Sequence, residues 1–376
     1  MAQSFLEGNE AIAWGALEAG CRFFAGYPIT PATTILNTML KILPPQGGIC
    51  LQGEDEIASI GFCLGASMAG VKAMTATSGP GISLYSEQIS FAIGSEIPIV
   101  IVDVQRLGPS TGSATRGADG DINFLRWGNS GGLPVVVLAP TDVRDCFSLT
   151  LQAFNLAEVF RCPVFIASNK EVAMTRESID LDAIQRPETI NRTKPPAGIP
   201  FLPFNISESR TVPYFLPIGD TVTVRQTSST HGSDGYITTD PDEIAANQNR
   251  LMRKLHLAVD RFSFFDAALE NSDTLILTYG VTARAAKVAA GLLKSAGKPV
   301  SLLVLKTLWP VPTNLIQQKA QNARRVVVVE MNLGQYVNEV KRILIEKRVD
   351  FFGQMDGRLI TPQQIMEVVA DDQSAE

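Results

Sequence analysis

Residues 98–105 read PIVIVDVQ, a short run rich in β-branched residues that is typical of a strand buried on both faces. Four similar runs lie between residues 11 and 169, and segments of helical period separate them: CRFFAGYP at 21–28, VKAMTAT at 71–77, LPVVVLAP at 133–140 and CPVFIAS at 162–168. Strands that alternate with helices indicate a mostly parallel sheet with helices on both faces. We therefore predict a doubly wound α/β domain.

A second, smaller alternation begins near residue 273. Its expected strands are DTLILTYG at 273–280, PVSLLVLKTLWP at 299–310 and RRVVVVEM at 324–331, and its expected helices are 282–297, 314–323 and 333–347. Between the two alternations the chain is rich in Pro, Ser, Thr and Gly and has no lasting periodicity. We predict a first domain at 1–183, an irregular excursion at 184–250 and a smaller α/β domain at 251–376. The excursion is expected to lie over a partner or to act as a flexible linker.

Composition narrows the class of protein. Of the 376 residues, 45% are hydrophobic and 19% charged, which excludes a disordered chain. No apolar run is long enough for a membrane span, and the net charge of -6 argues against a nucleic-acid surface. The amino terminus lacks the pattern of a signal peptide, so a cytoplasmic location is expected. The five cysteines are scattered without the spacing of a thiolate metal site, and no metal site is expected on this chain.

Ligands of open parallel sheets bind beyond the carboxyl ends of the strands, so the residues that follow each strand are the first candidates for a site. The strand at 21–28 ends in GYPITP, residues 26–31, where Thr30 is expected to cap a helix that begins at Pro31. The amides of that helix end and the Thr30 hydroxyl could hold a carboxylate or a keto oxygen. Ordinary capping explains the same spacing more simply.

Two further strand ends carry candidate residues. The strand at 71–77 leads into TSGPG, residues 77–81, a glycine turn that either admits a ligand to the backbone or only changes the chain direction. It lacks the lysine and the spacing of a P-loop. Arg106 directly follows the strand at 98–105, and its planar, permanently charged guanidinium suits a carboxylate. A surface ion pair with a nearby acid is the plainer alternative.

The segment at 52–70, QGEDEIASIGFCLGASMAG, has helical period and small residues along one face: Ala58, Gly61, Gly65, Ala66 and Ala69. Small residues permit close approach of another helix or of a cofactor. Three acids, Glu54, Asp55 and Glu56, lie at its amino end, where compensation of the helix dipole is the plain explanation. Glu56 stands directly ahead of the small-residue face. A carboxyl group there would enter a poorly solvated interface and suit a hydrogen bond to a ring nitrogen.

Several motifs follow one another along the chain: GNEAIAWGALEAGCRFFAGYPITPAT at 8–33, EDEIASIGFCLGAS at 54–67, ATSGPGISL at 76–84, VQRLGPSTG at 104–112 and RWG at 126–128. Together they resemble the α subunit of 2-oxoacid:ferredoxin oxidoreductases, and most of all the 2-oxoglutarate type. The likeness covers nearly the whole chain, and the smaller domain resembles the carboxyl-terminal domain shared with transketolases. The agreement of several motifs in order is far more specific than any one of them.

The resemblance implies that the first domain is the pyrimidine-side half of a thiamine-diphosphate site. By position, Glu56 would act catalytically by binding the aminopyrimidine ring, and Thr30 and Arg106 would bind the 2-oxoacid. The remaining cofactor-binding positions implied by the motifs are Pro28, Ile29, Ser78 and Gly79. The implied reaction is the oxidative decarboxylation of 2-oxoglutarate to succinyl-CoA and CO₂ with electrons passed to ferredoxin, or its reverse.

The GDG motif with a distal Asn, which in thiamine enzymes holds the diphosphate and Mg²⁺, is missing from this chain. The nearest text, ADGDIN at 118–123, begins with alanine and lacks the distal Asn. The resemblance therefore implies a β subunit that supplies the diphosphate and Mg²⁺ site and a [4Fe-4S] cluster. Coenzyme A as substrate, ferredoxin, separate γ and δ subunits and a dimer of αβ units are the further expectations.

Three alternatives remain open from the sequence. The same chemistry could act on a branched-chain 2-oxoacid or on pyruvate. A non-catalytic assembly subunit could keep the fold, although it would not need Thr30, Glu56 and Arg106. The chain could also be half of a transketolase or of a lipoamide-linked dehydrogenase, which would differ in its electron or acyl acceptor.

Overall fold

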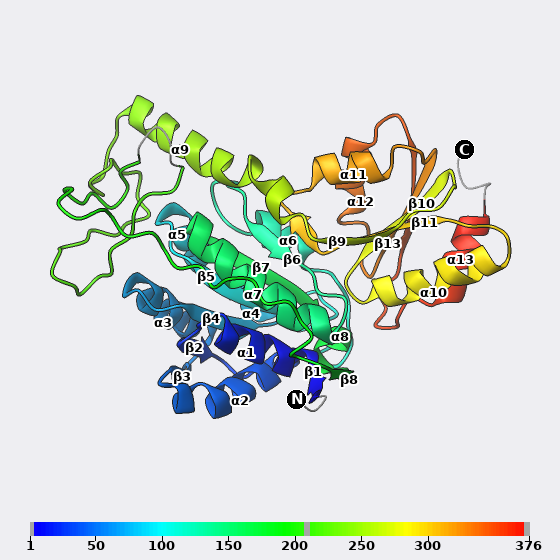
Figure 1. Ribbon diagram of the computed structural model, residues 1–376, viewed down its shortest axis with the longest axis horizontal. Coiled ribbons are helices and arrows are strands. Elements are labelled where there is room, and N and C mark those ends of the chain that lie inside the picture. The colour runs from blue at the N-terminus through cyan, green and yellow to red at the C-terminus, as the bar shows by residue number, and fades with distance from the viewer. Residues whose placement is uncertain (1–3, 207–210, 372–376) are drawn as a thin grey trace.

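A seven-stranded sheet, six of whose strands come from the first half of the chain, confirms the predicted doubly wound α/β fold (Figure 1). The computed structural model describes residues 4–206 and 211–371. The strands run in the order β12, β6, β7, β5, β4, β2, β3, and all neighbours are parallel except β12 and β6. Their bounds are β2 (Phe23–Gly26), β3 (Ile49–Gln52), β4 (Ala73–Thr77), β5 (Ile99–Gln105), β6 (Val136–Leu138), β7 (Pro163–Asn169) and β12 (Thr307–Trp309).

Helices cover both faces of this sheet. They are α1 (Gly8–Glu18), α2 (Thr33–Ile42), α3 (Glu56–Met68), α4 (Pro80–Leu84), α5 (Ser86–Gly94), α6 (Ile122–Trp127), α7 (Val143–Phe160) and α8 (Lys170–Met174). A 3-10 turn spans Pro44–Gln46, and β1 (Ser4–Glu7) pairs antiparallel with β8 (Arg176–Ile179).

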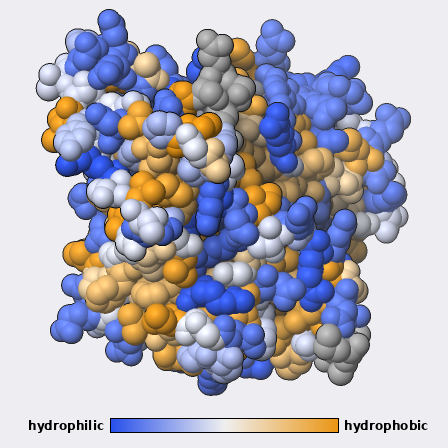
Figure 2. All heavy atoms as spheres, turned by 60° about the vertical axis from the view of Figure 1, so that its left-hand side comes forward, coloured by the Kyte–Doolittle hydropathy of each residue, from blue (hydrophilic) through white to orange (hydrophobic). Residues whose placement is uncertain are grey.

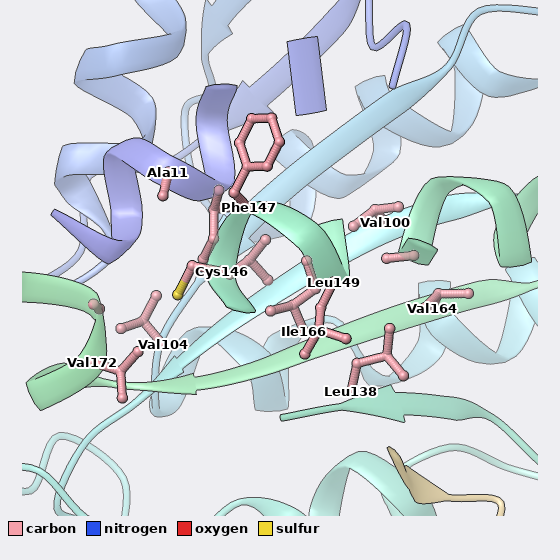
Figure 3. Packing of buried hydrophobic residues seen from close by; sticks show 14 of the residues in the cluster. Ala11, Val100, Val104, Leu138, Cys146, Phe147, Leu149, Val164, Ile166 and Val172 are labelled. Atoms are coloured by element: carbon pink, nitrogen blue, oxygen red, sulfur yellow. The ribbon is translucent and has the colours of Figure 1, made fainter. Parts of the chain in front are cut away.

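Alternate residues of β5 enter two separate cores. Val100 and Val104 pack with α1, α2 and α7, whereas Ile99 and Ile101 pack with α3, α5 and α6. In the first core, side chains of α7 lie over β5, β6 and β7: Cys146, Phe147 and Leu149 contact the layer that contains Leu138, Val164 and Ile166 (Figure 3). A central strand buried on both faces explains why its sequence is almost wholly apolar.

The second domain contains a five-stranded sheet in the order β14, β13, β10, β11, β9, in which only β9 is antiparallel to its neighbour. Its strands are β9 (Phe265–Ala268), β10 (Thr274–Tyr279), β11 (Ser301–Leu305), β13 (Arg325–Glu330) and β14 (Arg348–Gly353). Its helices are α10 (Thr282–Ser295), α11 (Thr313–Lys319), α12 (Val337–Ile343) and α13 (Pro362–Ala370). This smaller α/β domain agrees with the prediction.

Between β8 and α9 (Pro241–His256) the described residues contain no helix or strand. Helix α9 crosses the expected boundary at residue 250, and a 3-10 turn (Val259–Phe262) follows it. Glu96 of the first domain anchors α9, because its fully buried carboxylate accepts from Arg250 at 2.6 Å and from Lys254 at 2.9 Å. Burial opposes ionisation of Glu96, but Lys254 and Arg250 outweigh it and lower its pKa to about 2. No helix in the described ranges is long and apolar enough to cross a membrane.

One predicted strand was wrong, because the run is divided between the sheets of the two domains. The run at 299–310 was expected as one strand, but it divides at Lys306 into β11, in the second sheet, and β12, at the edge of the first. Lys306 at the division pairs with Asp145 and Asp266, one acid from each domain. The second domain therefore contributes an edge strand to the first sheet.

Candidate active site

Three of the predicted site segments meet at one edge of the first sheet, because β2, β4 and β5 are parallel neighbours and their carboxyl ends lie together. Arg106 follows β5, and its Nη1 donates a hydrogen bond of 2.6 Å to the carbonyl oxygen of Thr30, beyond β2. The side chain of Arg106 also passes Gly79, beyond β4, where a Cβ added to the glycine would lie 3.0 Å from Arg106 Nε. Thr30, Gly79 and Arg106 are thus brought together as the motifs implied.

Thr30 does not cap a helix, so that prediction was wrong. Helix α2 begins at Thr33, and its N-cap position is Ala32. Residues 30–32 form a turn that Asn9 of α1 holds in place, since Asn9 Nδ2 donates to the Pro31 carbonyl at 2.9 Å and to Thr34 Oγ1 at 2.7 Å. The Thr30 side chain is exposed at the sheet edge and remains available to a ligand.

Glu56 is the first residue of α3 and is only 9% exposed. Asp55 caps the helix by accepting a hydrogen bond of 2.7 Å from the Ala58 amide. That cap places the next side chain, Glu56, against α4, where Glu56 Cγ and Oε1 lie 3.0 and 3.2 Å from the position that a Cβ on Gly81 would occupy. The Glu56 carboxyl group makes no hydrogen bond or ion pair with the residues described, so its oxygens are available to a bound molecule.

The TSGPG turn uses its glycines for close approach. Gly79 has a φ of +50°, which glycine adopts readily. A Cβ on Gly81 would lie 2.0 Å from Thr77 Oγ1, so any side chain there would displace the turn and Glu56 together. Thr77 and Ser78 are both fully buried, and their hydroxyl groups have no hydrogen-bonding partner in the described part of the chain. Arg106 Nε is likewise buried and unpaired there.

Buried polar atoms without partners are unfavourable in a folded chain and mark places where a ligand completes the hydrogen bonding. Here they gather at the same sheet edge as the carboxylate of Glu56 and the exposed side chain of Thr30. Pro28 is exposed and Ile29 is half-buried in the segment that connects β2 to this turn. The arrangement offers a carboxylate, a guanidinium and free hydroxyl groups to one ligand region.

Sequence reasoning missed Tyr85, which lies behind Glu56. Tyr85 is fully buried, and its hydroxyl group is 2.9 Å from Thr75 Oγ1. Burial raises the pKa of Tyr85 well above its usual value, and the nearby Glu56 carboxylate adds to the rise. The phenol therefore stays neutral and supports the Glu56 side of the site. The sequence signal that could have identified this residue is a tyrosine one helical turn after TSGPG.

A second group missing from the predictions lies where the two domains meet. Asp119 of the ADGDIN segment is buried, its amide donates to the Met331 carbonyl at 2.8 Å, and its carbonyl accepts from Asn332 Nδ2 at 2.9 Å. Its carboxyl group accepts from Asn169 Nδ2 at 2.9 Å. Burial raises the pKa of Asp119 to about 7. ADGDIN therefore serves as a hydrogen-bonded contact between the domains.

The residues present fit one half of thiamine diphosphate. Glu56 can bind a ring nitrogen, and the glycine turn packs closely against it. Within the described ranges, no group of three or more His, Cys, Asp or Glu side chains could hold a metal ion.

Comparison with known proteins agrees with this geometry. The family model described as "Pyruvate flavodoxin/ferredoxin oxidoreductase, thiamine diP-bdg" matches residues 14–249, and "Pyruvate:ferredoxin oxidoreductase core domain II" matches residues 272–365. A 2-oxoglutarate synthase subunit KorA of Methanocaldococcus jannaschii is 40% identical over 98% of this chain and 100% of the relative. The corresponding subunit of Archaeoglobus fulgidus is 38% identical over 98% of this chain and 99% of the relative.

Solved structures show the same relationship. The 2-oxoglutarate:ferredoxin oxidoreductase of Magnetococcus marinus, solved with 2-oxoglutarate, coenzyme A and succinyl-CoA bound, superposes with a TM-score of 0.91 at 32% identity. The match covers 98% of this chain but 65% of that longer chain. A split-gene transketolase superposes with a TM-score of 0.57 at 15% identity over 97% of each chain, which shows a shared fold alone. The resemblance seen in the motifs is confirmed, and this chain belongs to the pyruvate flavodoxin/ferredoxin oxidoreductase family.

Proposed function

We propose that this chain is the α subunit of a 2-oxoglutarate:ferredoxin oxidoreductase. The enzyme forms succinyl-CoA, CO₂ and reduced ferredoxin from 2-oxoglutarate, coenzyme A and oxidised ferredoxin, or runs in the opposite direction. The observation that carries the proposal is the buried residue Glu56, whose carboxylate has no partner among the described residues and lies at the sheet edge that also presents Arg106 and Thr30. The names of full-length relatives at 37 to 40% identity support the choice of 2-oxoacid.

Each site residue has a role that its surroundings allow. Bound thiamine diphosphate supplies the electron sink for decarboxylation. Glu56 would share a proton with a ring nitrogen of the cofactor, which accepts the hydrogen bond when the carboxyl group holds the proton. Arg106 keeps donor positions free beyond the one used by Thr30, and these bind the carboxylate of the 2-oxoacid. The hydroxyl groups of Thr30 and Ser78 lie at the same edge as donors for substrate and cofactor oxygens, with Pro28, Ile29 and Gly79 lining the cofactor.

A β subunit completes the site in this proposal. It supplies the diphosphate and Mg²⁺ ligands and a [4Fe-4S] cluster, for which this chain shows no suitable group among its described residues. Apolar side chains beside Glu56 offer it a surface: Ile57 is 46% and Phe62 49% exposed on α3, and Leu84 is 47% exposed on α4. Figure 2 shows hydrophobic residues at several places on the side of the molecule that forms the left of Figure 1. Exposed apolar groups of this kind favour association with another chain.

The remaining expectations extend this assembly. Ferredoxin receives the electrons, separate γ and δ subunits complete the complex, two αβ units associate, and the complex works in the cytoplasm. Light scattering of the co-purified complex tests the association of αβ units, and the mass of a single αβ pair would contradict it.

The test of the catalytic assignment uses Glu56→Gln in the complex co-expressed with its β subunit. Loss of the carboxylate should lower the CoA-dependent reduction of a low-potential dye by 2-oxoglutarate roughly 10²- to 10⁴-fold, the range for a lost acid–base group. Glu54→Gln is the matched control, because Glu54 is an exposed acid in the same turn. Wild-type activity in Glu56→Gln would favour the non-catalytic assembly subunit.

A second candidate substrate is a branched-chain 2-oxoacid. A ketoisovalerate oxidoreductase subunit VorB of Methanothermobacter thermautotrophicus is 31% identical over 99% of this chain and 98% of the relative. Steady-state assays of the same complex on 2-oxoglutarate, 2-oxoisovalerate and pyruvate separate the candidates. A higher kcat/KM on 2-oxoisovalerate would replace 2-oxoglutarate as the substrate. Dye reduction that does not require coenzyme A would indicate a lipoamide-linked half instead, and two-carbon transfer between sugars without dye reduction would indicate a transketolase half.

A further inference from the structure

A buried acid lies in the middle of the sheet, three residues before Arg106. Asp103 is on β5, the central strand, and pairs in register with Thr77 of β4 and Ala167 of β7. Its side chain is fully buried, and neither carboxyl oxygen has a hydrogen-bond donor in the part of the chain that the structure describes. An ionised carboxylate without donors is strongly unfavourable in such a place. Asp103 therefore needs a proton or a partner.

The structure brings a second acid to it. Gln105, two residues after Asp103 and hence on the same face of β5, accepts a hydrogen bond of 3.0 Å from the amide of Asp121 through Oε1. Asp121 precedes α6, which covers that face, and its side chain does not cap the helix. One oxygen of Asp121 is also buried and unpaired within the described ranges. Three of the four carboxyl oxygens of Asp103 and Asp121 are thus buried on this face of the sheet without a partner among the described residues, and one proton shared by the two groups would supply a missing hydrogen bond.

The charges around the pair are few. Burial raises the pKa of Asp103 well above its usual value, and the neighbouring charge of Asp121 raises it further. Burial also raises the pKa of Asp121 to about 6. The positive charge of Arg106 lowers the pKa of both acids. A further acid outside the pair is Asp119. Burial raises its pKa, and the negative charges of Glu171 of α8, Glu330 of β13 and Asp121 raise it further.

We propose that Asp103 and Asp121 share one proton and act as a positioning pair for Arg106, so that a single negative charge stands beside its guanidinium. The proposal rests on the proposed function, in which Arg106 binds the 2-oxoacid. With one proton in the pair, a single negative charge neutralises the positive charge of Arg106. The remaining donors of Arg106 then stay available for the substrate carboxylate. With the proton lost, a second negative charge competes with the substrate for Arg106.

This arrangement makes substrate binding depend on pH. As the pH rises above neutral, the pair loses its shared proton and KM for the 2-oxoacid rises. The expected increase is roughly tenfold, because it comes from one charge added beside a largely buried cation. The value of kcat changes less, since neither acid contacts the reacting atoms.

The first test measures KM and kcat against pH in the co-expressed complex, using the 2-oxoacid that the complex prefers. Asp103→Asn and Asp121→Asn each leave one acid, so both should remove the rise in KM. Asp119→Asn is the matched control, because Asp119 is a buried acid of the same loop with a raised pKa that does not balance Arg106. It should keep the wild-type profile. A wild-type profile in both variants of the pair overturns the proposal.

The second test needs no substrate and therefore separates this proposal from the proposed function. Infrared difference spectra of the wild-type complex at neutral pH, recorded in H₂O and D₂O, should contain the carbonyl stretch of a protonated carboxylic acid. Asp119, whose pKa is raised to about 7, adds a band of its own near neutral pH, so the comparison is made in the Asp119→Asn variant. The band should be present in that variant and missing when Asp103→Asn is added to it. An Asp119→Asn complex without such a band, or a band that survives in the double variant, contradicts the shared proton. Asp121→Asn replaces Asp103→Asn in this comparison if the latter does not assemble.

Discussion

The guanidinium of Arg106 donates a hydrogen bond of 2.6 Å from Nη1 to the carbonyl oxygen of Thr30, 76 residues earlier in the chain. This bond ties the ends of β2 and β5 together and fixes the direction of the remaining donors. Arg106→Lys keeps the charge but not the planar fork. We expect KM for the 2-oxoacid to rise about 10- to 100-fold, which corresponds to one or two lost charged hydrogen bonds.

The control for Arg106 is Arg116→Lys. Arg116 is an exposed arginine at the end of the same loop. Steady-state kinetics should give a KM within about twofold of wild type for this variant, as for most surface substitutions. Equal effects of the two substitutions would contradict the special role of Arg106.

Gly81→Ala tests the close packing of the glycine turn against Glu56. The added methyl group would lie 2.0 Å from Thr77 Oγ1 and 3.0 Å from Glu56 Cγ, so both must move. We expect an overpacking cost of about 1–3 kcal/mol in the free energy of unfolding and a loss of thiamine-diphosphate affinity in the complex. Calorimetric titration with the cofactor and urea unfolding measure the two effects. Gly291→Ala on α10, which meets no atom within 4 Å, should leave cofactor affinity unchanged.

Glu96→Gln tests the anchor of α9. The variant leaves Arg250 and Lys254 without their buried partner, which should lower the free energy of unfolding by about 3–5 kcal/mol. Hydrogen exchange should rise first in α9. Glu270→Gln, which breaks a more exposed pair with Lys294, should change stability by less than about 1 kcal/mol. Similar losses in both variants would contradict the anchor.

The ion pairs of Glu96 also predict a pH dependence of stability, which the comparison of wild type with Glu96→Gln tests. The pKa of Glu96 is about 2 in the folded chain, below its ordinary value of 4.5. Its contribution to stability is therefore fully present above the ordinary value and is lost as the pH falls toward the folded value. Urea unfolding of wild type should weaken over that acidic range more steeply than unfolding of Glu96→Gln.

Asp119→Asn tests the contact between the domains. Burial raises the pKa of Asp119 from 3.8 to about 7, so the folded chain binds a proton more tightly than the unfolded chain does. Wild-type stability should then decrease as the pH rises from 3.8 to about 7, by on the order of 2–4 kcal/mol. The neutral Asn still accepts from Asn169 and should remove most of this dependence. Urea unfolding at several pH values checks it, and an unchanged slope in Asp119→Asn would contradict the assignment.

The sequence predicts the central strands because burial on both faces makes them apolar. It does not predict β3 and β14, which lie at sheet edges and are partly exposed. It also does not predict the division of the run at 299–310, because β11 and β12 have one continuous β pattern. Their separation depends on pairing of Thr307 and Trp309 with β6, a contact far away in the chain. Helix α9 was missed because its sequence is polar over most of its surface.

The candidate site was predictable where chemistry follows directly after a strand, as at Thr30, TSGPG and Arg106. The error at Thr30 arose from a tertiary contact, since Asn9 holds the turn that a local pattern assigned to a helix. Asp103 was hidden inside an apolar strand, and Tyr85 inside an ordinary helical segment. Their surroundings exist only in the fold. The roles of Glu56, Thr30, Arg106, Pro28, Ile29, Ser78 and Gly79 in binding stay predictions.

The central claim is that two chains bind the cofactor together, this chain at the pyrimidine ring and the other chain at the diphosphate. A cryo-electron-microscopy structure of the complex with thiamine diphosphate tests it directly, through the separation of the Glu56 carboxylate and the nearest pyrimidine nitrogen. The account predicts a hydrogen bond of about 2.6–3.2 Å, with the diphosphate and Mg²⁺ held by the other chain. A Glu56 carboxylate remote from the ring, or a diphosphate bound by this chain, would contradict it.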